Sequence, residues 1–378
     1  MTILPGVENL IENHVQVVAG KKIGFVSSAS GVTRNLTHSV DALLAAGVQV
    51  TALFGPEHGL YAAAPDGEEI KQMVDARTGL PVHSLYGQQY KPTGDMLAGL
   101  DALLFDIQAV GVRFYTYIAT LLHIMQAGAQ HGLPVIVCDR PNPITGALVE
   151  GPILQPGFES FVGPGPLPIR HGLTMGELGR LYQKFWGVDC EITVIPCQGW
   201  QRSMWFDQTG LHWVPASPGI PKMETMVVYP GTCLIEGTNL SEGRGYTTPF
   251  EVAGAPWVDA WKLASTLNAL ELPGVIFRPA DFQPTDNKWA DQPCAGVQLH
   301  VTNRHTFRPV TAGLHLVEAL RRLHPNDFAW REAHFDRLMG SDQTRLQLEA
   351  NVPIAEIVAG WIDEQAAFEE QRQQVMIY

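Results

Sequence analysis

The chain has 378 residues, of which 46% are hydrophobic and 17% are charged. That length suits two or three domains, and the apolar content excludes a mainly disordered chain. Its 25 basic and 38 acidic residues give a net charge of −13, which argues against nucleic acid as a partner. No apolar run reaches the roughly 18 to 20 residues that cross a bilayer, so we expect no membrane span.

The first residues, MTILPGVENLIENH, lack the basic and apolar regions of a secretory signal. We therefore expect a cytoplasmic protein, and a periplasmic or secreted location is the alternative if a signal was removed. The five cysteines form an odd set without a CxxC pair: Cys138, Cys190, Cys197, Cys233 and Cys294. This pattern favours buried reduced thiols over disulfides or a zinc site.

The first half of the chain alternates strand-like and helix-like segments, which predicts βαβ units and a mainly parallel sheet. The expected strands are 21–28, 48–54, 82–85, 101–108, 134–143 and 191–196. Apolar spacing predicts helices at 36–46 and 115–131. Another helix is expected around 174–186, where Thr174 and Glu177 match a capping box.

Beyond Trp213 the sequence becomes irregular and rich in Pro and Gly, so we place a domain boundary near residue 225. The remainder predicts helices near 257–269, 313–323 and 354–371, with strands at 275–279 and 296–301. The sequence thus predicts an α/β fold with a smaller second domain.

Ligands of an open parallel sheet bind beyond the carboxyl ends of its strands. The loops expected there are 27–34, 55–69, 106–117 and 139–145. Their candidate polar residues are Glu57, His58, Asp106, Arg113, Asp139, Arg140 and Asn142. GxGxxG, P-loop and GxSxG motifs are missing, and the histidines lack the spacing of a metal site, so the remaining chemistry is that of carboxylates.

Paired carboxylates are typical of glycoside hydrolysis. Glu57 follows an apolar strand and fits an acid/base role, although a helix cap or an arginine pair is the alternative. Asp106 and the Asp139–Arg140 pair could equally brace their loops. The glycine-punctuated segment 236–245 favours ligand contact, with Glu236, Asn239, Glu242 and Arg244 as its polar candidates.

Several motifs in fixed order resemble one bacterial family over nearly the whole chain. They are GPEHG (55–59), TGLPVHSLYG (78–87), DIQAVGVRFYTY (106–117), CDRPNPITG (138–146), SFVGPGPLPIRHGLTMGEL (160–178), YPGTCLIEGTNLSEGRG (229–245) and TTPFEVAGAPW (247–257). On these residues the chain is identified as a member of the exo-acting β-N-acetylmuramidases of the NamZ type.

The resemblance implies a Rossmann-like catalytic domain at 1–225 and a smaller C-terminal α+β domain at 226–378 that completes a cleft. The implied reaction removes terminal N-acetylmuramic acid from non-reducing ends of peptidoglycan fragments, without a cofactor. It marks Glu57 as the acid/base. The partner carboxylate stays open among Asp106, Asp139, Glu236 and Glu242, and Asp106 is the one we name with Glu57 as catalytic. The implied lining residues are Arg113, Arg140, His171, Glu236, Glu242 and Arg244.

Two further expectations concern the substrate. Aromatic residues near the loops, Tyr115 among them, suit stacking on a sugar or simply fill the core. A planar arginine can meet the lactyl carboxylate of muramic acid, and Arg113, Arg170 and Arg244 are the candidates. Because Ala109 and Gly219 depart from the family pattern, a non-catalytic or altered-specificity amino-sugar-binding protein is the alternative function. The oligomeric state is not predicted.

Overall fold

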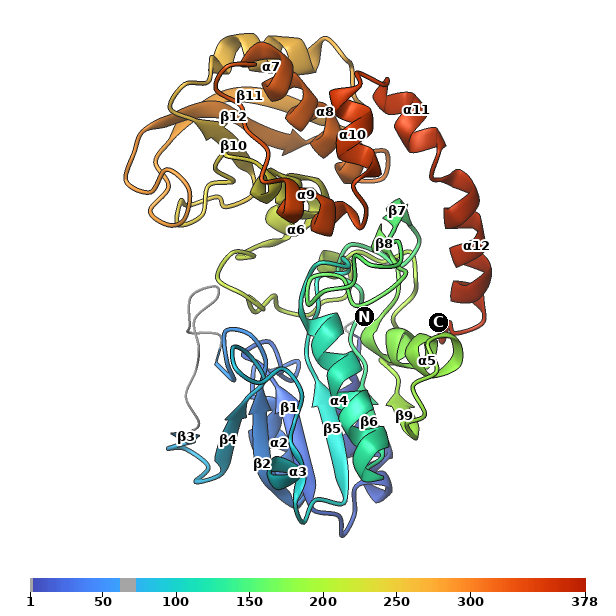
Figure 1. Ribbon diagram of the computed structural model, residues 1–378. Coiled ribbons are helices and arrows are strands. Elements are labelled where there is room, and N and C mark those ends of the chain that lie inside the picture. The colour runs from blue at the N-terminus through green and yellow to red at the C-terminus, as the bar shows by residue number, and fades with distance from the viewer. Residues whose placement is uncertain (1–2, 62–72) are drawn as a thin grey trace.

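The computed structural model describes residues 3–61 and 73–378. The chain folds into one part built on a seven-stranded sheet and a second part built on a three-stranded sheet, with helices around both (Figure 1). The predicted α/β fold class is confirmed. The end of the predicted loop 55–69 lies outside the described residues.

The larger sheet has the order β3-β4-β2-β1-β5-β6-β9, and every pairing except that of β3 with β4 is parallel. Its strands are β1 (Ile23–Ser27), β2 (Val50–Gly55), β3 (Met73–Val74), β4 (Pro81–Ser84), β5 (Ala102–Asp106), β6 (Val135–Cys138) and β9 (Ile192–Ile195). The predicted strands are therefore confirmed, with bounds that differ by one to five residues at each end.

Helices cover both faces of this sheet, because alternate strand residues point to opposite sides. Leu103 and Phe105 pack on the side of α4 (Tyr117–His131), whereas Leu104 packs on the side of α1 (Gly6–Asn13). The remaining helices of this part are α2 (Ser39–Ala45), α3 (Gly94–Leu97) and α5 (Met175–Phe185). The capping box predicted at the start of α5 is present.

The second part contains a sheet of order β10-β12-β11, with strands β10 (Val252–Ala255), β11 (Val275–Phe282) and β12 (Cys294–Val301). Its helices are α6 (Met223–Thr232), the 3₁₀ helix η3 (Cys233–Gly237), α7 (Ala260–Asn268), α8 (Pro309–Leu323), α9 (Glu332–Met339), α10 (Gln343–Glu349), α11 (Ile354–Ala359) and α12 (Ile362–Gln373). A short hairpin of β7 (Glu150–Ile153) and β8 (Pro168–Arg170) belongs to the connection between the parts.

Helix α6 was not expected, because its sequence contains Pro230 and Gly231 and reads as irregular. Both residues have a reason in the fold. Pro230 lies in the last turns of the helix, and a Cβ on Gly231 would stand 1.8 Å from the carbonyl oxygen of Pro309 in α8. The glycine therefore allows α6 and α8 to cross at backbone contact.

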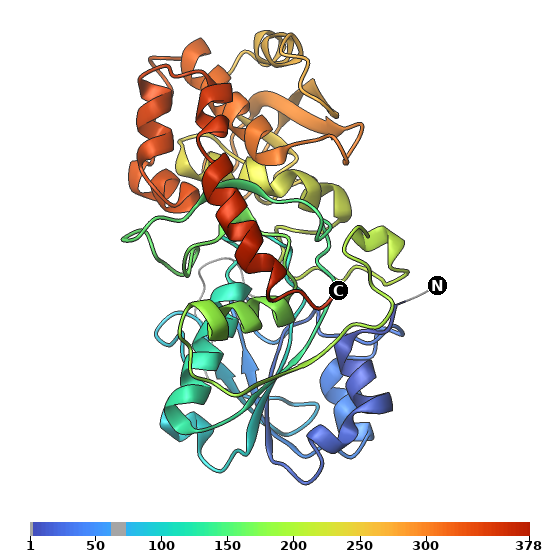
Figure 2. The same ribbon diagram turned by 90° about the vertical axis from the view of Figure 1, so that its right-hand side faces the viewer.

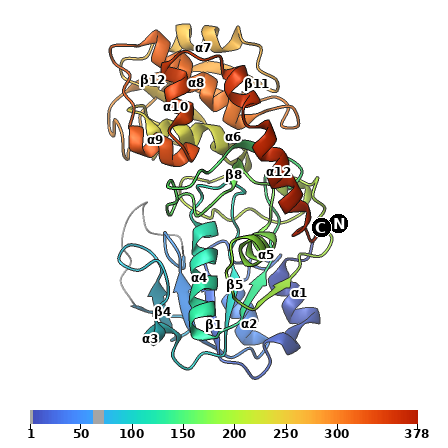
Figure 3. The ribbon, with the colours of Figure 1, turned by 45° about the vertical axis from the view of Figure 1, so that its right-hand side comes forward.

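The single helix predicted at 354–371 is wrong. The chain leaves α11 after Ala359 and begins α12 at Ile362, with Gly360 between them. Helix α12 then runs back along the first part of the molecule (Figures 2 and 3). There Gln365 donates to the Gly151 carbonyl at 2.9 Å and Arg372 to that of Gly146 at 2.7 Å.

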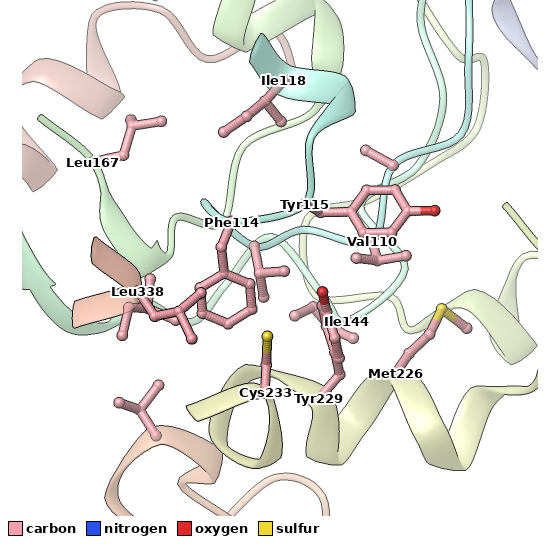
Figure 4. Packing of buried hydrophobic residues seen from close by; sticks show 14 of the residues in the cluster. Val110, Phe114, Tyr115, Ile118, Ile144, Leu167, Met226, Tyr229, Cys233 and Leu338 are labelled. Atoms are coloured by element: carbon pink, nitrogen blue, oxygen red, sulfur yellow. The ribbon is translucent and has the colours of Figure 1, made fainter. Parts of the chain in front are cut away.

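A continuous apolar cluster joins the two parts (Figure 4). Phe114 and Tyr115, from the loop after β5, meet Tyr229 of α6 and Leu338 of α9, and the Phe114 and Tyr229 rings lie 5.4 Å apart edge to face. Cys233 is buried in the same cluster. All five cysteines are free and buried, which confirms the prediction of buried thiols.

Arg113 lies at the same junction and is fully buried. Its guanidinium donates to the carbonyls of Pro152 and Leu167, at 2.9 and 2.5 Å, and to that of Leu338 in α9 at 2.7 Å. Burial lowers the pKa of Arg113 to about 9. These three hydrogen bonds compensate the buried charge and tie the β7–β8 connection to α9.

We expect Arg113→Met to lower the free energy of unfolding by about 3 kcal/mol, because three buried carbonyls lose a charged donor. Urea denaturation measures this change. Arg322→Met is the matched control: Arg322 is an exposed arginine paired with Glu318 on one helix, and it should cost less than about 1 kcal/mol. Equal effects of the two substitutions would contradict the structural role of Arg113.

Candidate active site

A cavity of about 430 Å³ lies beyond the carboxyl ends of β2, β4 and β5, against the second part of the molecule. Its principal polar lining residues are Glu57, His58, Tyr86, Thr116, Ser160, Ser217, Glu236, Arg244 and Arg337. Tyr90, Tyr115, Phe161, Tyr229 and Phe250 add aromatic surface. Of the predicted site residues, the cavity therefore gathers Glu57, His58, Tyr115, Glu236 and Arg244.

Glu57 stands on a tight turn directly after β2. The Gly59 amide donates to the Pro56 carbonyl at 2.8 Å, and His58 has a φ of 68°, in the left-handed region that non-glycine residues rarely adopt. A Cβ on Gly55 would stand 2.7 Å from the Leu60 nitrogen. The close packing of this turn directs Glu57 into the cavity, and such strained backbone is common at functional sites.

Neutral hydroxyl groups surround the Glu57 side chain. Thr116 Oγ1 donates to Glu57 Oε2 at 2.7 Å, and the Tyr117 hydroxyl contacts the Glu57 carbonyl at 3.3 Å. Burial, together with the charge of Glu57, raises the pKa of Tyr86 and of Tyr117, so both stay protonated. Thr116 therefore orients the carboxyl group, and the charge of Glu57 also reaches Arg244, where it acts to raise the pKa that burial lowers.

Glu236 comes from η3, in the second part of the molecule, and its partners are cationic or basic. Arg244 Nη2 lies 2.5 Å from Glu236 Oε1, and His334 Nε2 lies 3.3 Å from Oε2. Burial raises the pKa of Glu236 to about 7, with Glu57 acting in the same direction against Lys288 and Arg331. The ion pair with Arg244 favours the ionised carboxylate.

A second glutamate, Glu242, binds two of the cations near Glu236. Glu242 is buried and binds Arg244 Nε at 2.9 Å and Lys288 Nζ at 2.9 Å. Arg244 also lies over the Phe250 ring, 5.1 Å from its centroid. Burial lowers the pKa of His334 to about 4, and neighbouring cations lower it further, so the imidazole is neutral. Within the segment 236–245, Arg244 therefore binds both Glu236 and Glu242. Glu236 and Arg244 line the cavity.

The structure places Asp106 and Arg140 outside this cavity. Asp106 is fully buried, and its two oxygens bind Arg140 Nε at 2.6 Å and Nη2 at 2.8 Å. Arg140 Nη2 also donates to the Val32 carbonyl at 2.9 Å. This bidentate pair occupies both side chains and braces the loops after β1, β5 and β6.

Asp139, Asn142 and His171 also have structural partners instead of a place in the cavity. Asp139 accepts from Thr174 Oγ1 at 2.7 Å and from the Gly176 amide at 2.8 Å at the start of α5. Asn142 donates to the Leu173 carbonyl at 3.0 Å, and His171 Nδ1 accepts from the Leu173 amide at 3.1 Å. Burial lowers the pKa of His171 to about 3, so its ring is neutral.

Arg113, Arg170, Asn239 and Glu242 do not line the cavity either. Asn239 bridges the Asp327 carbonyl and the Ala329 amide, at 2.8 and 3.0 Å. Arg170 is buried and donates to the Ile144 carbonyl. Of the three arginines proposed for the lactyl carboxylate, the structure therefore leaves only Arg244 beside the cavity.

The two departures from the family pattern lie in different surroundings. Ala109 is buried, and its carbonyl accepts from Gln108 Nε2 at 2.8 Å. Gly219 lines the cavity, where a Cβ would stand 3.1 Å from the Phe250 ring. A side chain at position 219 would therefore contact the Phe250 ring closely, and the Arg244 guanidinium lies over that ring.

Several residues in or next to the cavity were not predicted from the sequence, and of these Arg337 lines it. Lys288, His334 and Arg337 come from the β11–β12 connection and from α9, far along the chain from Glu57, and no local motif marks them.

Within the described ranges, no cluster of His, Cys, Asp and Glu is arranged to hold a metal ion. No helix among these residues has the length and apolarity that a membrane span requires.

Comparisons with known proteins find matches to both parts of the chain. The family profile described as exo-beta-N-acetylmuramidase NamZ, N-terminal, matches residues 23–224, and its C-terminal counterpart matches residues 227–378. A Bacillus subtilis (strain 168) protein, peptidoglycan beta-N-acetylmuramidase NamZ, is 44% identical over 375 residues, which are 99% of this chain and 91% of the relative.

Solved structures of two DUF1343 family proteins from Bacteroides fragilis NCTC 9343 share the fold. One superposes with a TM-score of 0.93 at 34% identity, and the other with 0.81 at 30% identity. Each match covers 100% of this chain and 99% of the other. With both domain profiles matched in order and a full-length relative at 44% identity, the chain belongs to the NamZ exo-β-N-acetylmuramidase family.

Proposed function

We propose that this protein is a glycoside hydrolase that releases terminal N-acetylmuramic acid from the non-reducing ends of peptidoglycan fragments, as an exo-β-N-acetylmuramidase. The observation that carries this proposal is the presence of two carboxyl groups, Glu57 and Glu236, on opposite parts of the chain in one cavity of about 430 Å³. Family membership and the name of the B. subtilis relative support it.

The two carboxyl groups have surroundings that suit different tasks. Burial raises the pKa of Glu236, and the like charge of Glu57 acts in the same direction. Arg244 favours the ionised form of Glu236, whereas Glu57 has hydroxyl partners. On this difference in partners we assign proton donation to Glu57 and charge stabilisation to Glu236.

Catalysis then follows from the charges. As the bond from C1 to the glycosidic oxygen breaks, Glu57 donates its proton to the leaving oxygen. Glu236 faces the positive charge that develops at the sugar ring and stabilises it. Water adds to C1 and gives up a proton, which restores Glu57. Thr116 holds the Glu57 side chain in place through this cycle.

We expect the purified protein to release the aglycone from a chromogenic β-N-acetylmuraminide and not from the matching glucosaminide. Glu57→Gln should lower kcat by about 10² to 10⁴-fold, because the proton donor is lost. Glu224→Gln, which changes an exposed glutamate on α6, is the matched control and should keep full activity. Steady-state assays of the three proteins measure this.

Full activity of the Glu57→Gln variant would remove Glu57 from the mechanism. Binding of N-acetylmuramic acid without release from either substrate would favour the non-catalytic sugar-binding function instead.

The pH profile tests the role of Glu236. Since Glu236 must be ionised, kcat/KM should fall as the pH drops through about 7, the pKa to which burial raises this group. Arg244→Gln removes a cation that favours the ionised form, so this acid limb should move to higher pH. Lys222→Gln, which removes an exposed cation paired with Glu251, should leave the limb in place. An unshifted limb in Arg244→Gln would contradict the assignment.

A further inference from the structure

One cationic side chain that lines the cavity forms no ion pair with the described residues. Arg337, in the last turn of α9, is exposed and lines the cavity. Among residues 3–61 and 73–378 its guanidinium forms no ion pair and no side-chain hydrogen bond. The other cations near the carboxylates differ, because Arg244 binds Glu236 and Glu242, and Lys288 binds Glu242.

The position of Arg337 places it on the Glu236 side of the cavity. It lies three residues after His334, on the same face of α9, and its charge helps to lower the pKa of His334, which contacts Glu236. The next residue, Leu338, has its carbonyl held by the buried Arg113 at 2.7 Å. The backbone below Arg337 is therefore fixed while its side chain remains available.

A second polar group in the same cavity also lacks a protein partner. Ser160 Oγ is buried without a hydrogen bond in the described structure, and Ser160 lines the cavity. Buried polar atoms are nearly always satisfied, so an unsatisfied hydroxyl beside a cavity indicates a ligand that supplies the partner.

We propose that Arg337 binds the lactyl carboxylate of the muramic acid ring and so sets the preference for muramic acid over glucosamine. This inference rests on the proposed function. The cavity already contains Glu57 and Glu236, which repel a further anion unless a cation is free to meet it. The planar guanidinium suits bidentate binding of a carboxylate, and the protein carboxylates neutralise Arg244 and Lys288.

The test combines a protein change with a substrate change. Two chromogenic muraminides are compared, one with the free lactyl carboxylate and one with that group converted to its primary amide, which is similar in shape and uncharged. For the wild type, we expect kcat/KM to be about 10- to 100-fold higher with the carboxylate, the range for a charged hydrogen-bonded pair. Arg337→Gln should abolish this preference, mainly through KM, because it lowers hydrolysis of the carboxylate substrate far more than hydrolysis of the amide.

Arg331→Gln is the matched control. Arg331 immediately precedes the same helix and contacts the Glu236 carbonyl at 3.5 Å, but it does not line the cavity. Its loss should change both substrates by the same factor. Arg337→Lys keeps the charge but not the planar fork, so it should retain part of the preference and provides a second variant should Arg337→Gln be unstable.

A wild-type preference retained in Arg337→Gln, or an equal loss on both substrates, would overturn the proposal. Hydrolysis of neither substrate by the wild type would instead overturn the proposed function. Calorimetric titration with free N-acetylmuramic acid and its lactyl amide would then still test Arg337, because binding requires no turnover. Equal affinities for the two sugars would overturn the role of Arg337.

Discussion

The buried guanidinium of Arg113 is the interaction on which the geometry of the cavity depends. Among residues 3–61 and 73–378 it forms no ion pair with a carboxylate, and three backbone carbonyls from two parts of the molecule compensate its charge. Three residues later, Thr116 of the same loop binds Glu57. One short segment after β5 therefore orients the carboxyl group on one wall and anchors α9, which forms the other wall. Both walls of the cavity are therefore hydrogen-bonded to the same loop.

The chain is strongly acidic, yet cations gather around Glu236. Arg244, Lys288 and Arg331 all lie close enough to act on that carboxylate, and Glu242 holds the first two in place. Glu57, in contrast, is surrounded by hydroxyl groups. This difference distinguishes two otherwise similar glutamates and gives them separate roles. It also explains why an additional arginine without a protein partner is significant for an anionic sugar.

Much of the fold could be predicted from the sequence because buried parallel strands are continuous apolar runs, as at 101–108, and because the capping box of α5 is local. Glu57 could be singled out for the same reason, since it follows such a strand. The fate of Asp106 and Arg140 could not be predicted, because strand-end charges suit a ligand or each other equally well. Helix α6 was missed, since Gly231 is explained only by its contact with α8. Arg337 reaches the cavity, and His334 reaches Glu236, through tertiary packing alone.

The assignment of the catalytic pair is best tested by a crystal structure of the Glu57→Gln variant with a disaccharide of N-acetylmuramic acid β-linked to N-acetylglucosamine. The muramic ring should lie in the cavity, with its glycosidic oxygen at hydrogen-bond distance, about 3 Å, from the side chain at position 57. Glu236 should face C1 of that ring. A disaccharide bound with its glycosidic bond away from both positions would contradict the assignment of the catalytic pair.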